Sequence, residues 1–176
     1  MRRIFCVMSV LLLISATGCA SGKIHERSYL RAAAVMKGTE CGLTLSFYDE
    51  DDAVSAYGAD MDHARSNAEL KNGKPVFTGY TELILIDGTE CHEYLEHMLN
   101  DWKVSPSCIV AYCENGTELI EKSSAERLIG VVRQAVRKGI APKCDIITVL
   151  GRLYNGHSAE VAELYADGTA GSRKID

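Results

Sequence analysis

Hydrophobic residues recur along this chain with two different periods, and each period predicts a different kind of element. Residues 41–48 place apolar side chains at every second position, which is typical of a half-buried strand. The runs 81–86 and 108–113 are apolar almost throughout, as strands covered on both faces are. These two runs therefore predict the centre of a sheet.

Other segments repeat their apolar residues at three- and four-residue steps, the period of an amphipathic helix. Thr89 is the expected N-cap of one such helix, and Gly139 is the expected stop of another. Helices are predicted over 61–71, 91–102 and 117–122, and a last one from a cap at Ser123 or Ser124 to Gly139. Residues 29–36 fit a strand or a short helix. Residues 145–154 also fit both, and the helix is preferred.

These elements predict the α+β class: a single domain with a mixed β-sheet packed against several amphipathic helices. A length of 176 residues allows one hydrophobic core and hardly two. We expect this α+β domain to span residues 29–167. Residues 168–176 have no periodicity and are expected to form a loose tail.

The first residues have the pattern of an export signal. Arg2 and Arg3 are followed by the apolar stretch 4–14, and small residues then lead directly to Cys19. Small residues before a cysteine resemble a bacterial lipobox, although Ala16 stands where Leu is usual. Residues 1–18 are therefore predicted to be a lipoprotein signal peptide. An ordinary signal peptide or an uncleaved anchor is the alternative.

Cys19 is accordingly predicted to be the lipidation site, where acyl chains would hold the protein to the membrane from outside the cytoplasm. Residues 19–28 would then form a polar tether. Loss of Arg2 and Arg3 with the signal would change the formal net charge from −5 to −7. An acidic chain of this kind argues against a nucleic-acid partner, because phosphate contacts need clustered Lys and Arg.

The search for reactive groups gives three weak candidates, and we predict no catalytic residue, no metal site and no cofactor. Residues 60–63 place His63 near two aspartates, but a solvated polar turn is the simpler explanation. Residues 156–160 begin like a nucleophile elbow with His157 and Ser158, yet Glu160 occupies the position of the second glycine. The acidic turn 49–52 lacks the spacing of a calcium loop.

Five further cysteines follow Cys19, and none belongs to a Cys-x-x-Cys pair. Their apolar neighbours favour a role as small packing residues rather than as metal ligands. A single disulfide, for example between Cys41 and Cys144, remains open. The five are Cys41, Cys91, Cys108, Cys113 and Cys144.

One segment resembles a known family. In residues 74–88, Phe77, Gly79 and Tyr80 precede the apolar strand, and the helix and second strand follow at 93–113. This arrangement resembles the Ger(x)C family, the lipoprotein C subunits of nutrient germinant receptors in spore-forming bacteria, with Tyr80 where the family usually has His. The similarity extends over about residues 18–154 and corresponds to an N-terminal domain only.

The resemblance implies a non-enzymatic lipoprotein of spore germination. It would be anchored through Cys19 in the outer leaflet of the spore inner membrane and assembled with integral membrane germinant-receptor subunits. Two alternatives belong to other classes. One is a stand-alone extracytoplasmic lipoprotein that binds a small ligand or a divalent metal through the acidic segment 49–62. The other is an envelope hydrolase that uses Ser158 and His157.

Overall fold

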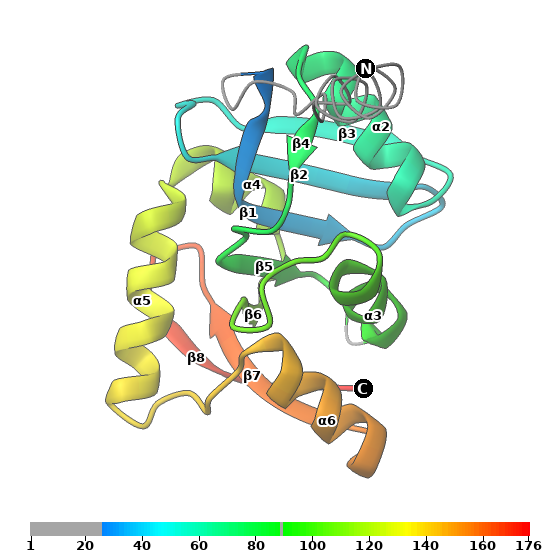
Figure 1. Cartoon of the computed structure of the whole chain (residues 1–176). Coiled ribbons are helices and arrows are strands. Elements are labelled where there is room, and N and C mark those ends of the chain that lie inside the picture. The colour runs from blue at the N-terminus through cyan, green and yellow to red at the C-terminus, as the bar shows by residue number, and fades with distance from the viewer. Residues whose placement is uncertain (1–25, 89) are drawn as a thin grey trace, which may run out of the picture.

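The computed structural model of this protein describes residues 26–88 and 90–176 (Figure 1). The predicted signal peptide, the lipidation site Cys19, most of the tether and the predicted cap Thr89 lie outside the described residues. No helix in the described ranges is long and apolar enough to cross a lipid bilayer.

The strands of the described chain form one mixed sheet in the order β3-β2-β1-β5-β6-β7-β8, and β4 pairs with β1 alone. Neighbours among β1, β5, β6 and β7 run parallel, whereas β2, β3 and β8 are antiparallel to their neighbours. The strands are β1 (Ser28–Met36), β2 (Cys41–Phe47), β3 (Val54–Gly58), β4 (Val76–Phe77), β5 (Leu83–Ile86), β6 (Ile109–Tyr112), β7 (Ala159–Leu164) and β8 (Ala170–Ile175).

Helices cover both faces of this sheet, with α4 and α5 on one face and α2, α3 and α6 on the other (Figure 1). The α+β class with a mixed sheet and several amphipathic helices is therefore confirmed. The helices are α2 (Met61–Asn72), α3 (His92–Asn100), α4 (Gly116–Lys122), α5 (Ala125–Arg137) and α6 (Ile146–Gly156).

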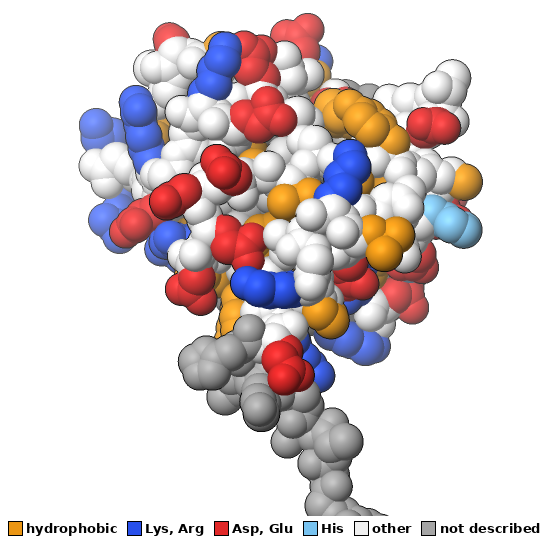
Figure 2. Space-filling model, turned by 90° about the horizontal axis from the view of Figure 1, so that it is seen from above, with side chains coloured by type: hydrophobic (Ala, Val, Ile, Leu, Met, Phe, Trp, Pro, Cys, Tyr) orange, Lys and Arg blue, Asp and Glu red, His pale blue; other side chains and the backbone are white. Residues whose placement is uncertain are grey.

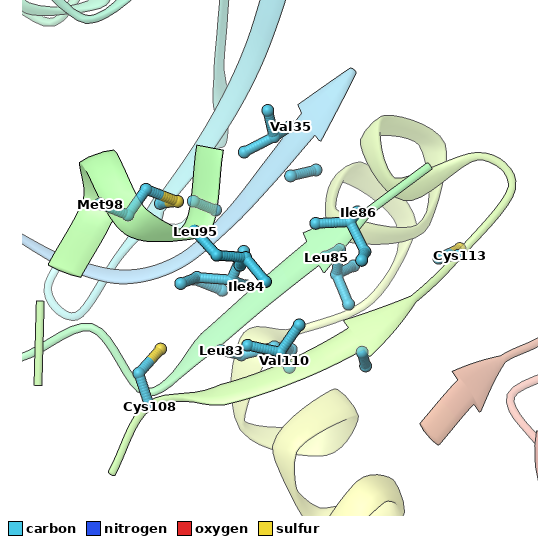
Figure 3. Close-up of a cluster of buried hydrophobic side chains, with 14 of the residues drawn as sticks. Val35, Leu83, Ile84, Leu85, Ile86, Leu95, Met98, Cys108, Val110 and Cys113 are labelled. Carbon is cyan, nitrogen blue, oxygen red and sulfur yellow. The ribbon is translucent and has the colours of Figure 1, made fainter. Parts of the chain in front are cut away.

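The centre of the sheet is the apolar strand β5, as its sequence predicts. All four of its residues are buried, and Leu95 and Met98 of α3 lie over Ile84 on one face (Figure 3). On the other face, Gly116 at the start of α4 approaches Leu85 so closely that a Cβ there would lie 3.3 Å from the Leu85 Cβ. A strand covered on both faces needs apolar residues at every position, which explains the continuous run.

Backbone and capping hydrogen bonds decide between strand and helix for the two segments that fit both. Residues 29–36 belong to β1, which pairs with β2, β4 and β5. Residues 145–154 lie in α6 and the N-cap that precedes it. The Asp145 carboxylate caps this helix by accepting a hydrogen bond of 3.0 Å from the Thr148 N–H. The preferred helix is confirmed.

The strand predicted at 41–48 exists as β2, but its half-buried character is wrong. Thr44, which the alternation assigns to solvent, is fully buried. Its hydroxyl lies 2.8 Å from the hydroxyls of both Ser55 and Thr117. Since Thr117 belongs to α4, this helix covers the polar face of β2 and supplies a hydrogen-bond partner for the buried hydroxyl. Buried hydroxyls need such partners, and alternation alone does not reveal them.

Two predicted boundaries are corrected by the structure. Residues 170–175 of the predicted loose tail form β8, which pairs with β7 along its whole length and buries Ile175 completely. The polar residues of this edge strand are exposed, so the backbone pairing with β7 rather than an apolar pattern holds it. At the other end, Ser28 belongs to β1 and not to the tether, since it is buried and its N–H donates to the Pro75 carbonyl at 3.0 Å.

Candidate functional site

An apolar hollow of the described surface is a groove between α5, the start of α6 and the chain that enters β6. Its volume is about 590 Å³. Apolar side chains form most of its wall: Pro106, Ile109, Val132, Val136, Cys144 and Ile147. Ile147 is 49% exposed although it is a large aliphatic side chain. We call this hollow the α5–α6 groove.

Local backbone bonds position the walls of the groove. Val132 and Val136 lie one helical turn apart on α5, so both face the same side. Opposite them, the chain before α6 bridges to β6: the Ile146 N–H donates to the Cys108 carbonyl, and the Val110 N–H donates to the Cys144 carbonyl, both at 2.8 Å. The two walls therefore belong to rigid elements.

The rim of the α5–α6 groove is basic although the chain as a whole is acidic. Arg133, Arg137 and Lys143 contribute the cations. Arg133 Nη2 lies 2.8 Å from Glu82 Oε2, and Lys143 Nζ lies 3.2 Å from Asp145 Oδ2. The guanidinium of Arg137 forms no ion pair or hydrogen bond with another described residue.

Asp145 contributes a carboxylate to the rim. Burial opposes its ionisation, but the hydrogen bonds from the Thr148 hydroxyl and N–H and the charge of Lys143 outweigh that effect and lower the pKa of this carboxyl. Asp145 is therefore ionised at neutral pH, and its oxygens are engaged by the first turn of α6.

The aspartates of the predicted polar turn 60–63 have structural roles. Asp60 caps α2 by accepting the His63 N–H at 2.8 Å. Asp62 accepts a hydrogen bond from Trp102 Nε1 and lies 3.0 Å from His97 Nε2, which ties α2 to α3. These hydrogen bonds lower the pKa of the Asp62 carboxyl. No cluster of three metal-ligating side chains occurs in the described ranges.

The acidic turn 49–52 is tied to the protein as well. The Ser28 hydroxyl donates to Glu50 Oε1 at 2.7 Å, and Lys74 Nζ lies 3.3 Å from the same oxygen. Glu50 therefore fastens the start of β1 to the turn. This contact gives the turn a structural explanation.

His157 and Ser158 do not assemble into a nucleophile elbow. His157 occupies the left-handed C-cap of α6 with φ at 54°, and its N–H donates to the Leu153 carbonyl. No hydrogen bond joins its ring to Ser158 among the described contacts. The geometry thus gives the hydrolase hypothesis no support.

All five described cysteines are buried free thiols. Burial raises the pKa of each thiol, and it raises that of Cys91 to about 12. A thiol with a raised pKa is a poor nucleophile and a poor metal ligand at neutral pH. The predicted packing role is confirmed, and Cys41 and Cys144 are not paired.

The chain was compared with family models, curated proteins and solved structures, and none of them matches. The α5–α6 groove was missed by the sequence analysis because three separate segments build it. One signal was present: on α5, Arg133 and Arg137 stand directly after Val132 and Val136, so a basic edge runs beside the apolar stripe.

Proposed function

We propose that this protein is a non-catalytic lipoprotein subunit of a spore nutrient germinant receptor. It is anchored by acyl chains on Cys19 at the extracytoplasmic face, in the outer leaflet of the spore inner membrane, and it assembles with integral membrane subunits. The observation that carries a binding role is the α5–α6 groove. Part of its apolar wall is open to solvent, whereas the candidate reactive groups of the described domain are engaged in packing, capping and ion pairs.

The distance between the lipidation site and the domain supports a tether. Since β1 begins at Ser28, nine residue steps separate Cys19 from the folded domain, and they span at most about 30 Å. A domain held so close to the membrane meets membrane-bound partners at a high effective concentration. The short tether therefore favours partners in the same membrane.

The surface charges support anchoring by lipid rather than by electrostatic attraction. On the face seen in Figure 2, acidic and basic side chains are interspersed, and no large basic patch is visible. Stable attachment to an anionic leaflet without lipid would need clustered Lys and Arg. The acyl chains on Cys19 are therefore the anchor in this proposal.

The resemblance to the Ger(x)C family supports the receptor assignment. Its strand, helix, second strand and further helices were expected across the segment 81–154. The domain has elements of these types in this order: β5, α3, β6, α4, α5 and α6. The alternative, a stand-alone lipoprotein, shares the anchor but requires no partner. The groove favours its small-ligand form over its metal-binding form, because Glu50, Asp60 and Asp62 are engaged within the protein.

Deletion of the gene tests the receptor assignment. We expect spores without this protein to germinate slowly or not at all with nutrients, and a reintroduced copy to restore the rate. Germination by a stimulus that bypasses nutrient receptors should stay normal, which controls for general spore damage. Normal germination of the deletion strain with every tested nutrient would contradict the proposal.

A further inference from the structure

We propose that the α5–α6 groove is a binding site for a small carboxylate with an apolar body. The site would hold the hydrocarbon part between Ile109, Val136 and Ile147 and the carboxylate beside Arg137. This inference goes beyond the receptor assignment and does not depend on it, because it rests on the described residues alone.

The size and wall of the groove suit a small molecule. A volume of about 590 Å³ lies within the range of small-molecule sites, which is roughly 300–1,000 Å³. Such sites typically combine an apolar wall with a few polar groups that fix orientation. Here the wall is aliphatic, and the polar groups lie on the rim. An apolar ligand body gains free energy in proportion to the surface it removes from water.

The charges of the rim favour an anion. Glu82 pairs with Arg133 and Asp145 pairs with Lys143, so Arg137 is the lining cation whose side chain has no carboxylate partner among the described residues. One carboxylate would pair with this cation.

Arg137 is the residue best suited to hold the carboxylate. Its guanidinium has no partner among the described residues, and a guanidinium can bind a carboxylate through two parallel hydrogen bonds. Arg133 is less available, since Glu82 already accepts from its Nη2. Lys143 is 76% exposed, and an exposed ion pair such as Lys143–Asp145 contributes little, so this lysine can swing toward a ligand.

Octanoate is a suitable probe, with octanamide and octylamine as neutral and cationic controls of the same length. The experiment uses the full chain in lipid nanodiscs with labelled Ile and Val methyl groups, followed by NMR. The readout is the methyl shifts of Ile109, Val132, Val136 and Ile147, which partition of the probe into lipid does not mimic. We expect saturable shifts with octanoate at a dissociation constant on the order of millimolar, as for other ligands of about ten heavy atoms. We expect weaker binding of octanamide and no saturable shift with octylamine.

Two variants separate the contributions of charge and packing. Arg137→Gln should weaken octanoate binding about fivefold to tenfold and leave octanamide unchanged. Arg127→Gln, the same change elsewhere on α5, should have no effect. Val136→Asp should abolish binding of both probes, and a methyl spectrum that is native away from the groove shows that this variant folds.

Three results would overturn the proposal: no shift of the groove methyls with octanoate, equal affinity for octanoate and octylamine, or no effect of Arg137→Gln. The first result would leave the groove as a surface for a protein partner only. None of these results would alter the germination phenotype expected for the gene deletion, so the two proposals fail separately.

Discussion

Arg133 of α5 is held by Glu82, whose Oε2 accepts a hydrogen bond of 2.8 Å from the guanidinium Nη2. Glu82 directly precedes the central strand β5, so this contact joins the rim of the groove to the middle of the sheet. The same carboxylate accepts the Tyr48 hydroxyl at 3.0 Å and lies 3.4 Å from Arg31 Nε. Burial opposes ionisation of Glu82, but the hydrogen bonds from Tyr48 and Arg133 and the two cationic charges outweigh it and lower the pKa of the carboxyl.

Replacing this carboxylate should weaken the fold. For Glu82→Gln we expect the free energy of unfolding to fall by about 1–2 kcal/mol, because charged hydrogen bonds at a mostly buried site are lost. Urea denaturation at neutral pH measures the change. Glu126→Gln removes a carboxylate that is 79% exposed and lies 3.7 Å from Arg31, and it should change stability by less than about 0.5 kcal/mol. Equal effects of the two substitutions would contradict the role assigned to Glu82.

Stability should also depend on pH through Glu82. Its pKa in the folded protein is lowered from the ordinary value of 4.5, so its ionised form stabilises the fold at every pH above that value. This contribution should be lost as the pH falls below 4.5 and through the folded pKa. The urea midpoint should therefore decrease under acid, and the decrease should be smaller in Glu82→Gln. Asp62 and Asp145, whose pKa values are also lowered, account for part of the remaining decrease.

Two glycines should respond to alanine in opposite directions. A Cβ at Gly58 would lie 2.3 Å from the Ala64 backbone nitrogen, because α2 crosses the end of β3 at this point. Gly58→Ala should destabilise the protein by about 2–3 kcal/mol. Gly130 is exposed within α5 with open space around it, so Gly130→Ala should stabilise by about 0.5–1 kcal/mol. Thermal unfolding of both variants measures this difference, and a neutral Gly58→Ala would show that α2 does not approach β3 so closely.

The five cysteines of the domain should resist alkylation while it is folded. Each thiol is buried with a raised pKa, so little thiolate is available at neutral pH. Iodoacetamide treatment followed by peptide mass spectrometry should find the peptides of Cys41, Cys91, Cys108, Cys113 and Cys144 unmodified in buffer and alkylated in denaturant. Rapid modification of Cys108 in the folded protein would contradict its complete burial.

The sequence predicted those helices and strands whose pattern of apolar residues matches the faces that they bury in the fold. The apolar spacing in α5 and α6 predicted those helices, and the apolar run 81–86 identified the central strand. The strands β3, β7 and β8 were missed because backbone pairing with a neighbouring strand, and not an apolar pattern, determines them. In β7, for example, the glutamates at 160 and 163 obscure the buried residues between them.

The groove could not be predicted for a related reason. Its walls come from residues 106–109, 132–137 and 143–147, which the βα connections bring together. No single segment contains the site. In the sequence, only the basic residues beside the apolar stripe of α5 were visible. They indicate a binding site only together with the residues that form the opposite wall of the groove.

In the proposed function, this protein acts in germination while tethered through Cys19. The rate of nutrient-triggered germination in spores whose only copy carries Cys19→Ala tests this claim most directly. Cys6→Ala, which changes a cysteine of the predicted signal peptide, provides the matched control, and these spores should germinate normally. We predict that Cys19→Ala spores germinate as slowly as spores without the gene. Germination of Cys19→Ala spores at the wild-type rate would contradict the account.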